Sequence, residues 1–235
     1  MSLDFKKIRN HAIKWRDFCF DLLFPINCLG CEKEGSWLCD DCFNKIELAG
    51  EIIESNEMIK DCIHLDGLCF AVDYNDKVVA RLIKTMKYKF IKDINKLLAE
   101  FIIKFFEQGM THGLETIDWK NSIIIPVPLH VRRLKWRGFN QAKEIGQRLA
   151  LYLNCLFAEE LRRVKNNRPQ AKLKAEERWR NIEECFVLAN SIDLEEKTVF
   201  LVDDVATTGA TLNECAKVLK AAGAREVWGV VVARG

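Results

Sequence analysis

The sequence lacks the features that mark an exported, membrane-spanning or low-complexity protein. Its 235 residues contain no uninterrupted apolar segment of the roughly 20 residues that a helix needs to cross a bilayer. They show no internal repeat, no low-complexity segment and no long Gly/Ser linker, and the charges nearly cancel at a formal +2. We therefore expect a cytoplasmic protein with one substantial domain and a small appendage.

Cysteine is abundant for a sequence without an export signal, because ten of the residues are cysteines. Without export, thiols and metal ligands are expected rather than disulfides. Two C-x-x-C pairs stand close together: Cys28/Cys31 and Cys39/Cys42. Four thiolates complete the tetrahedral shell that zinc prefers and leave no open position, so we expect structural Zn²⁺. An iron–sulfur cluster and free thiols in a small core are the alternatives, and Cys62, His64 or Cys69 could replace one ligand.

The remaining cysteines and the first residues of the chain have a simpler interpretation. We expect small buried hydrophobic side chains at Cys19, Cys155, Cys185 and Cys215. Apolar residues recur at helical spacing within residues 1–24, which predicts an amphipathic helix; we expect it to pack on the protein, with a position on a membrane surface as the alternative. We place the zinc module at residues 25–65 and a larger domain at residues 66–235.

Strand-like and helix-like patterns alternate through the larger domain. Strands are expected at residues 68–74, 122–128, 186–188, 199–202 and 227–232, and helices at residues 77–89, 94–106, 139–153 and 211–222. Short apolar runs between amphipathic helices are typical of α/β proteins. The expected fold class is therefore α/β, with a doubly wound, mostly parallel sheet.

Residues 199–212, V-F-L-V-D-D-V-A-T-T-G-A-T-L, form the most informative segment. The apolar run suits a strand buried on both faces, and Asp203 and Asp204 follow at its carboxyl end, where ligands bind in open α/β sheets. The next loop offers N–H groups, hydroxyls and a helix N-terminus to a phosphate. Its residues are Ala206, Thr207, Thr208, Gly209, Ala210 and Thr211. Carboxylates do not hold phosphate, so we assign them to ribose hydroxyls or bound Mg²⁺.

The alternatives for this segment are an ordinary strand–turn–helix and a different phosphate loop. The sequence contains no G-x-x-x-x-G-K-[ST] motif, which disfavours a P-loop nucleotidase.

A second candidate anion site follows the strand at residues 122–128. P-V-P-L-H at residues 126–130 precedes R-R-L-K-W-R-G-F-N-Q at residues 132–141, so cations reach the same sheet edge as the aspartates. Such cations neutralise a pyrophosphate. Amide side chains at the start of a helix can both cap the helix and bind a ligand. The candidates are Arg132, Arg133, Arg137, Asn140 and Gln141. A solvated basic loop is the alternative.

These motifs, in this order, resemble the ComF/GntX family from about residue 24 to the end of the chain. The likeness includes the Lys87-Tyr88 pair and Q-x-x-L-x-x-x-x-R-x-x-N-x-x-x-x-F at residues 170–186. It implies a type I phosphoribosyltransferase-like fold with a zinc module, and phosphoribosyl pyrophosphate (PRPP) bound with Mg²⁺. Asp203 and Asp204 would address the ribose 2′- and 3′-hydroxyls, and residues 207–211 the 5′-phosphate.

The same resemblance implies a role in DNA uptake, natural transformation or use of external DNA, with single-stranded DNA and other competence proteins as partners. Two functions compete. One is a phosphoribosyltransferase; the other is a non-catalytic DNA-binding competence factor that retains the PRPP fold. For the DNA-binding function, basic residues would contact phosphates and the aromatic residues among them would stack on bases. These aromatic residues are Trp136, Phe139 and Trp179.

Two departures from related proteins bear on catalysis. The family commonly has Thr where this chain has Asn167, in the segment that would cover PRPP as a flexible hood. Hypoxanthine-type enzymes place an acidic base at the position of Thr207, whose hydroxyl cannot replace a carboxylate. A catalytic group would then come from the hood, where the candidates are Lys165 and Arg168, or from the pocket that binds the acceptor.

Overall fold

The computed structural model describes residues 25–48, 52–54, 62–109, 114, 117–167, 174–190 and 192–235. The chain divides into two compact units, Met1–Ile46 and Glu47–Gly235. The amphipathic helix that we predict within residues 1–24, with Cys19, lies outside the described residues.

The smaller unit carries the cysteine pairs on a turn and a short helix. A β-bridge joins Asn27 to Glu34 and closes the turn around the first pair. Cys39 occupies the N-cap of α2 (Asp40–Lys45), which holds Cys42. Two acidic residues in the first turn of α2 interact favourably with the positive end of the helix dipole and stabilise the helix.

The larger unit is built on a six-stranded sheet with the order β1-β2-β8-β7-β3-β4. Its strands are β1 (Ile52–Glu54), β2 (Gly67–Asp73), β3 (Ser122–Pro126), β4 (Leu156–Phe157), β7 (Thr198–Ala206) and β8 (Glu226–Arg234). Among the described strands of this sheet, β1 runs antiparallel to its neighbour and the other pairs are parallel. The predicted α/β class with a mostly parallel sheet is confirmed.

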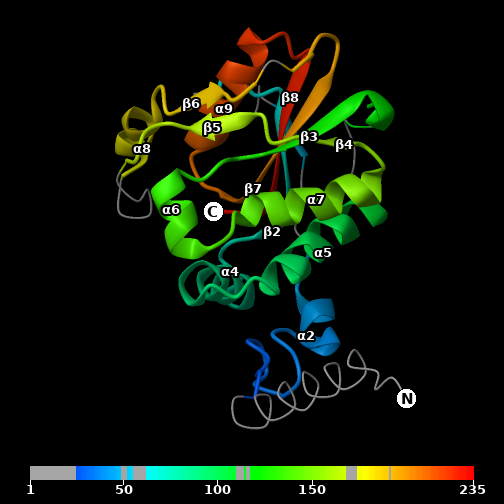
Figure 1. Cartoon of the computed structure of the whole chain (residues 1–235). Coiled ribbons are helices and arrows are strands. Elements are labelled where there is room, and N and C mark those ends of the chain that lie inside the picture. Colours follow the sequence, from blue (N-terminus) through cyan, green and yellow to red (C-terminus); the bar gives the residue numbers. More distant parts are fainter. Residues whose placement is uncertain are drawn as a thin grey trace, which may run out of the picture. The chain divides into compact units, whose positions relative to one another are not determined.

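Helices cover both faces of this sheet (Figure 1). On one face, α5 (Ile94–Glu107) contacts β2 and β8, and α7 (Gln141–Leu153) contacts β3 and β7. α4 (Lys77–Lys89) packs on α5. On the other face, α9 (Ala210–Ala221) contacts β7 and β8. Apolar strands buried on both faces are what such a doubly wound arrangement requires.

α4 shows how local sequence places a functional side chain. The Asp76 carboxylate accepts hydrogen bonds from the backbone N–H groups of Val78 and Val79 and so starts the helix. Apolar residues spaced three and four apart form its buried face: Val79, Leu82, Ile83 and Met86. Burial of each such side chain stabilises the fold by about 1.5–3 kcal/mol. Lys87 follows this face and reaches the carboxyl end of the sheet.

A separate two-stranded sheet and one helix form a module that we call the hood. β5 (Leu161–Arg163) pairs antiparallel with β6 (Phe186–Leu188), and α8 (Ala175–Ile182) lies between them in the chain. α8 and β6 contact α9. The strand predicted at residues 186–188 therefore exists but does not join the main sheet. Phe186 is buried and Val187 exposed, a one-sided pattern that suits an antiparallel strand pair with one face toward solvent.

Two predicted boundaries at the carboxyl end of the sheet differ from the structure. β7 continues to Ala206, because its ladder with β8 extends past the aspartates and pairs Val205 with Ala233. No helix is predicted between the strand at residues 122–128 and the helix at residues 139–153, but the basic segment between them forms a helix, α6 (Val131–Arg137). The His130 ring nitrogen Nδ1 accepts the Arg132 N–H at its start, and Gly138 ends it with φ of 83°.

The division between the units also lies earlier in the chain than the boundary expected after residue 65. Residues 52–54 form β1, which pairs with β2 and so belongs to the larger unit. Within the described ranges, no helix is both long and apolar enough to cross a membrane.

Candidate functional site

The loop after β7 forms a small pocket at the carboxyl end of the sheet. Its lining consists of Asp203 and the residues of the loop and first turn of α9: Val205, Ala206, Thr207, Thr208, Gly209, Ala210, Thr211 and Leu212. Gly209 adopts φ of 73° at the N-cap, which brings the chain from the strand into the helix. The first N–H groups of a helix lack intrahelical partners and point toward an anion there. The pocket therefore suits a phosphate, as the motif predicts.

A larger cavity of about 630 Å³ adjoins the same strand end. Its charged lining residues are Lys87, Arg132, Arg133, Arg137, Arg163, Asp203 and Asp204. Its other lining residues include Tyr88, Trp136, Gln141, Asn166, Asn167 and Thr211. Asp203 and Thr211 line both pockets, so a ligand with one phosphate in the loop can extend into the larger cavity.

The adjacent carboxylates have different surroundings, since neighbouring side chains of a strand point to opposite faces. Asp203 lines both pockets, whereas Asp204 lines only the larger one. Asp204 Oδ1 lies 2.8 Å from Lys87 Nζ. Asp204 Oδ2 is buried and has no hydrogen-bond partner among the described residues. Asp204 is thus fixed by an ammonium through one oxygen, and its other oxygen is left without a hydrogen-bond partner among the described residues.

Burial and mutual repulsion set the charges of this pair. Burial and the charge of Asp204 raise the pKa of Asp203 to about 7, although Lys87 and Arg137 oppose the shift. Burial would lower the pKa of Lys87, but the attraction of Asp204 outweighs it and raises that pKa. Near neutral pH, Asp203 is therefore the group whose charge responds to a ligand.

The basic helix α6 contributes three arginines to the cavity, as predicted: Arg132, Arg133 and Arg137. Arg137 is 8% exposed and donates from Nη1 to Gln141 Oε1, while its Nε has no partner among the described residues. Burial lowers the pKa of Arg137, and Asp204 opposes the shift. Such a guanidinium is suited to an anionic ligand in a poorly solvated site.

Asn140 has a structural position. Its Oδ1 accepts the backbone N–H of Ala142 at the start of α7, and its Nδ2 donates to the Val127 carbonyl at 3.1 Å. It does not line the cavity, whereas Gln141 does. Of the two predicted amides, only Gln141 stays a candidate ligand.

Among the described residues, the hood meets the site through Arg163 and Arg178 and not through Lys165. The ammonium of Lys165 lies 3.1 Å from Glu184 and also binds the Glu183 carbonyl, and it does not line the cavity. Arg168 lies outside the described residues. The hood instead places Arg163 in the cavity wall, and Arg178 Nη1 donates to Thr207 Oγ1 at 2.7 Å.

Asn167 connects parts of the hood. Its amide nitrogen donates to the Asn181 carbonyl and contacts Cys185 Sγ at 3.1 Å. The side chain that replaces the usual Thr therefore helps to hold the hood together.

Sequence reasoning did not assign Lys87, Tyr88, Arg163, Asn166 or Arg178 to the site. The Lys87-Tyr88 pair was recognisable as a motif, but nothing in its spacing points to β7. Arg178 is the arginine of the motif at residues 170–186 and lies between its apolar residues Leu173 and Phe186. Its place in that motif is the sequence feature that could have identified it. The contacts themselves required the fold.

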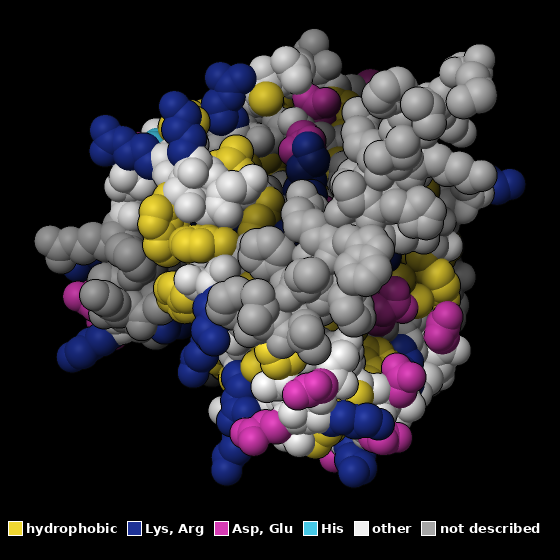
Figure 2. All heavy atoms as spheres, turned by 60° about the horizontal axis from the view of Figure 1, so that its bottom comes forward, with side chains coloured by type: hydrophobic (Ala, Val, Ile, Leu, Met, Phe, Trp, Pro, Cys, Tyr) yellow, Lys and Arg dark blue, Asp and Glu magenta, His cyan; other side chains and the backbone are white. Residues whose placement is uncertain are grey.

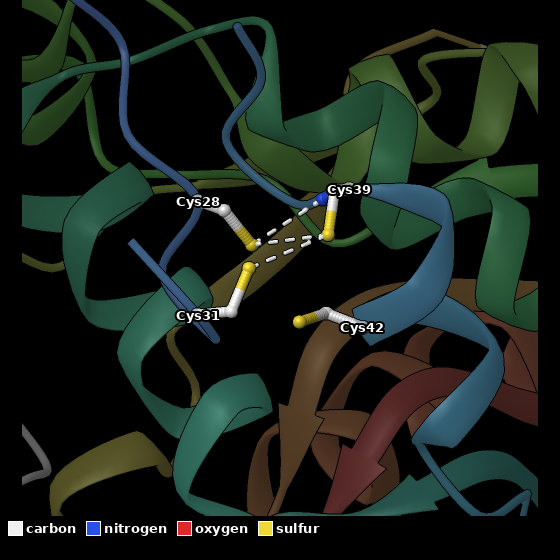
Figure 3. A group of neighbouring side chains, drawn as sticks. All are labelled: Cys28, Cys31, Cys39 and Cys42. Carbon is white, nitrogen blue, oxygen red and sulfur yellow. Dashed lines mark hydrogen bonds between the residues drawn. The ribbon is translucent and has the colours of Figure 1, made fainter. Parts of the chain in front are cut away.

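The four predicted cysteine ligands converge in the smaller unit, where their sulfurs all lie within 4.8 Å of one another (Figure 3). Cys39 Sγ lies 3.7 Å from Cys28 Sγ and 3.6 Å from Cys31 Sγ. Zinc–sulfur bonds of about 2.3 Å in a tetrahedron require sulfurs about 3.8 Å apart. The cluster could therefore hold a metal ion such as zinc.

The thiol environments also favour a cation. Although burial opposes it, hydrogen bonds from the backbone of Cys39 and Gly30 help lower the pKa of Cys28 to about 6. Burial and the neighbouring sulfurs raise the pKa of Cys42 to about 12. A cation among the sulfurs would offset this effect and favour the thiolate of Cys42. Cys62 and Cys69, considered as substitutes, are buried in the larger unit, where Cys62 Sγ contacts the Thr208 carbonyl.

Comparison with known proteins agrees with this architecture. Residues 135–235 match the family described as the phosphoribosyl transferase domain. The matched range includes the loop after β7, the hood and the two central strands β7 and β8. With the mostly parallel sheet, the match defines the class of the larger unit as a phosphoribosyltransferase-type fold.

Three relatives narrow this class. The chain is 31% identical over 210 residues to Competence protein F of Haemophilus influenzae, covering 86% of this chain and 89% of that protein. It is 32% identical over 151 residues to DNA utilization protein YhgH of Escherichia coli (63% of this chain, 64% of that protein). It is 32% identical over 161 residues to Competence protein ComFC of Bacillus subtilis (68% and 61%). The chain belongs to the ComF family.

Proposed function

We propose that the protein binds PRPP together with Mg²⁺ and transfers its phosphoribosyl group to an acceptor. The observation that carries the proposal is that the phosphate loop and the cation-lined cavity share Asp203. The loop takes the 5′-phosphate, the aspartates take the ribose hydroxyls, and the arginines of α6 take the pyrophosphate. Carboxylate oxygens are the hard donors that Mg²⁺ prefers, and Mg²⁺ would add positive charge beside the pyrophosphate.

In this reaction an acceptor atom forms a bond to ribose C1, and the bond from C1 to the pyrophosphate oxygen breaks. The pyrophosphate leaves with the electron pair. Arg132, Arg133 and Arg137 line the cavity where this charge develops, and stabilisation of such charge is commonly the largest contribution to the rate. The hood contributes Arg163 to the same wall.

Titration calorimetry with Mg-PRPP tests the proposal. Wild type should bind, and the double variant Asp203→Ala/Asp204→Ala should lose binding. Asp93→Ala is the matched control, because its carboxylate lies on the surface and pairs with Lys96. Absence of binding by the folded wild type would overturn the proposal.

The names of the relatives support a cellular role in uptake or use of external DNA. Proteins of the DNA-uptake machinery are the partners that such a role implies. We place the protein in the cytoplasm, where PRPP is made available to such enzymes.

A non-catalytic single-stranded DNA-binding function is the second candidate, and exposed aromatic residues favour it. Tyr88 and Trp136 are 61% and 59% exposed at the cavity, beside Arg132 and Arg133. Figure 2 shows exposed hydrophobic side chains at the left of the view with Lys and Arg side chains close by. Of the three aromatic residues predicted to stack on bases, only Trp136 is exposed: Phe139 is buried, and Trp179 is half-buried against the core.

Base stacking combined with phosphate contacts gives binding that weakens steeply with salt. Fluorescence anisotropy with a labelled oligonucleotide at rising salt tests this function. Trp136→Ala should reduce affinity more than Trp119→Phe, a control at a ring stacked on Phe200. An affinity for the oligonucleotide that does not change with salt concentration would contradict the DNA-binding function.

A further inference from the structure

Lys87 connects the end of one helix to the centre of the candidate site. It lies in the last turn of α4, where the negative end of the helix dipole favours a cation. Its Nζ is 2.8 Å from Asp204 Oδ1. The Lys87 side chain is 24% exposed and the Asp204 side chain only 4%. Both residues line the larger cavity, so the ion pair is part of its wall.

The second oxygen of Asp204 is the informative atom. An ionised carboxylate accepts hydrogen bonds at both oxygens. Oδ1 has its ammonium, but the buried Oδ2 has no partner within the described part of the chain. Buried polar atoms in native proteins are almost always satisfied, so an unpaired acceptor in a cavity wall indicates a ligand donor. A phosphate oxygen cannot donate, whereas a sugar hydroxyl can.

We propose that Lys87 is a positioning residue for the ribose hydroxyls: it holds the Asp204 carboxylate through Oδ1 and leaves Oδ2 to accept a hydrogen bond from one hydroxyl of the ligand. This inference rests on the proposed function and adds a residue to it. Lys87 acts through Asp204 and does not itself bind the pyrophosphate.

Charge balance explains why a lysine is required at this place. Asp203 and Asp204 are neighbours at the same strand end, and two ionised carboxylates there repel one another. The ammonium of Lys87 compensates the charge of Asp204 and fixes its carboxylate through Oδ1. Without the ammonium, Oδ1 would lose its salt-bridge partner and the carboxylate would lose this fixed orientation.

The test compares two fragments of PRPP. Ribose 5-phosphate contains the hydroxyls and lacks the pyrophosphate, and inorganic pyrophosphate with Mg²⁺ contains only the leaving group. Calorimetry of both fragments is carried out on wild type, Lys87→Met, Asp204→Asn and the double variant. Lys89→Met is the matched control, because Lys89 is exposed on the same helix and does not line the cavity.

Lys87→Met and Asp204→Asn should each weaken ribose 5-phosphate binding about tenfold. The double variant should be no weaker than either single one, because both remove the same hydrogen bond. Pyrophosphate binding should stay within about twofold of wild type in Lys87→Met. Lys87→Arg should restore part of the affinity, which a loss of general stability would not explain.

Three results would overturn the inference. Additive losses in the double variant would show that Lys87 acts independently of Asp204. An equal or larger loss for pyrophosphate would make Lys87 a direct pyrophosphate ligand. Unchanged ribose 5-phosphate binding in folded Lys87→Met would remove its role.

The double variant Lys87→Met/Asp204→Asn, in which both side chains are neutral, serves as the control for folding. If Lys87→Met alone does not fold, the double variant removes both charges and should fold, since breaking one side of a buried pair is the more damaging change. It should then bind ribose 5-phosphate as Asp204→Asn does, and a further loss beyond about threefold would overturn the inference. Failure of wild type to bind PRPP would instead contradict the proposed function. It is distinguishable from failure of the inference, which appears in the Lys87 variants while wild type binds.

Discussion

Arg178 of the hood donates a hydrogen bond from Nη1 to the Thr207 hydroxyl of the phosphate loop at 2.7 Å. The bond joins α8 to the first loop residue after β7. The loop pocket itself is lined by Asp203 and uncharged residues. A phosphate held there lies near a carboxylate, so the guanidinium supplies a compensating charge at its edge.

Substitution of Arg178 should therefore weaken phosphate binding. Arg178→Gln should reduce the affinity for ribose 5-phosphate about tenfold, which corresponds to about 1.4 kcal/mol and suits one charge-assisted hydrogen bond. Arg178→Lys should retain part of it. Titration calorimetry measures the affinity of each variant for ribose 5-phosphate. Ribose, which lacks the phosphate, is the comparison ligand. The control is Arg180→Gln on the same helix, where the side chain is exposed; an equal loss in the control would contradict the assignment.

Asp203 should make folding stability depend on pH in the direction opposite to that of an ordinary aspartate. Its pKa in the folded protein is raised to about 7, by burial and by Asp204, above the ordinary value of 3.8. Between these values the folded state holds more protons than the unfolded state. Stability therefore falls as pH rises from about 4 to about 7.

Replacement by a neutral amide should remove this dependence. Asp203→Asn should raise the free energy of unfolding by about 1–3 kcal/mol at pH 8 and change it little at pH 4. Urea denaturation at both values measures the difference. Asp93→Asn, a change at a 70% exposed side chain, should show no such pattern. A gain of the same size at both pH values would show that the charge of Asp203 is not its cause.

Gly30 is predicted to be essential for the geometry of the cysteine cluster. A Cβ at this position would lie 2.7 Å from Cys42 Sγ and 3.0 Å from Cys42 Cβ, so Cys42 would have to move. Gly30→Ala should lower zinc affinity at least about tenfold, since a tetrahedral site tolerates deviations of only about 0.2 Å. Zinc release to a chromophoric chelator measures this. Lys33→Ala, an exposed change in the same turn, should release zinc as wild type does.

The fold was largely predictable where the sequence alternates between apolar strands and amphipathic helices. The helix expected at residues 77–89 has those limits in the structure, because Asp76 caps it and its apolar face is regular. The pocket-forming loop after β7 and the cysteine cluster could also be located from the sequence, since each lies within a short segment whose residue types have few other uses.

The remaining parts depend on contacts between distant segments. The pairing of Lys87 with Asp204 joins a helix end to a strand end far along the chain, and no periodicity records it. β5 and β6 are three residues each, too short for a pattern to show which sheet they join. Lys165 looked suitable as a charged hood residue, but neighbouring Glu184 binds its ammonium.

Asn140 provides a test that separates stability from ligand binding within one motif. Its side chain caps α7 and ties the helix start to the Val127 carbonyl, and it stays outside the cavity wall. Asn140→Ala should lower the free energy of unfolding by about 0.5–2 kcal/mol, the usual effect of losing a cap. Asn140→Ser keeps a neutral oxygen that can accept the Ala142 N–H and should lose less. Pyrophosphate affinity of folded Asn140→Ser should match wild type, whereas Gln141→Ala should weaken it through Arg137. A weaker affinity in Asn140→Ser with unchanged stability would instead make Asn140 a ligand.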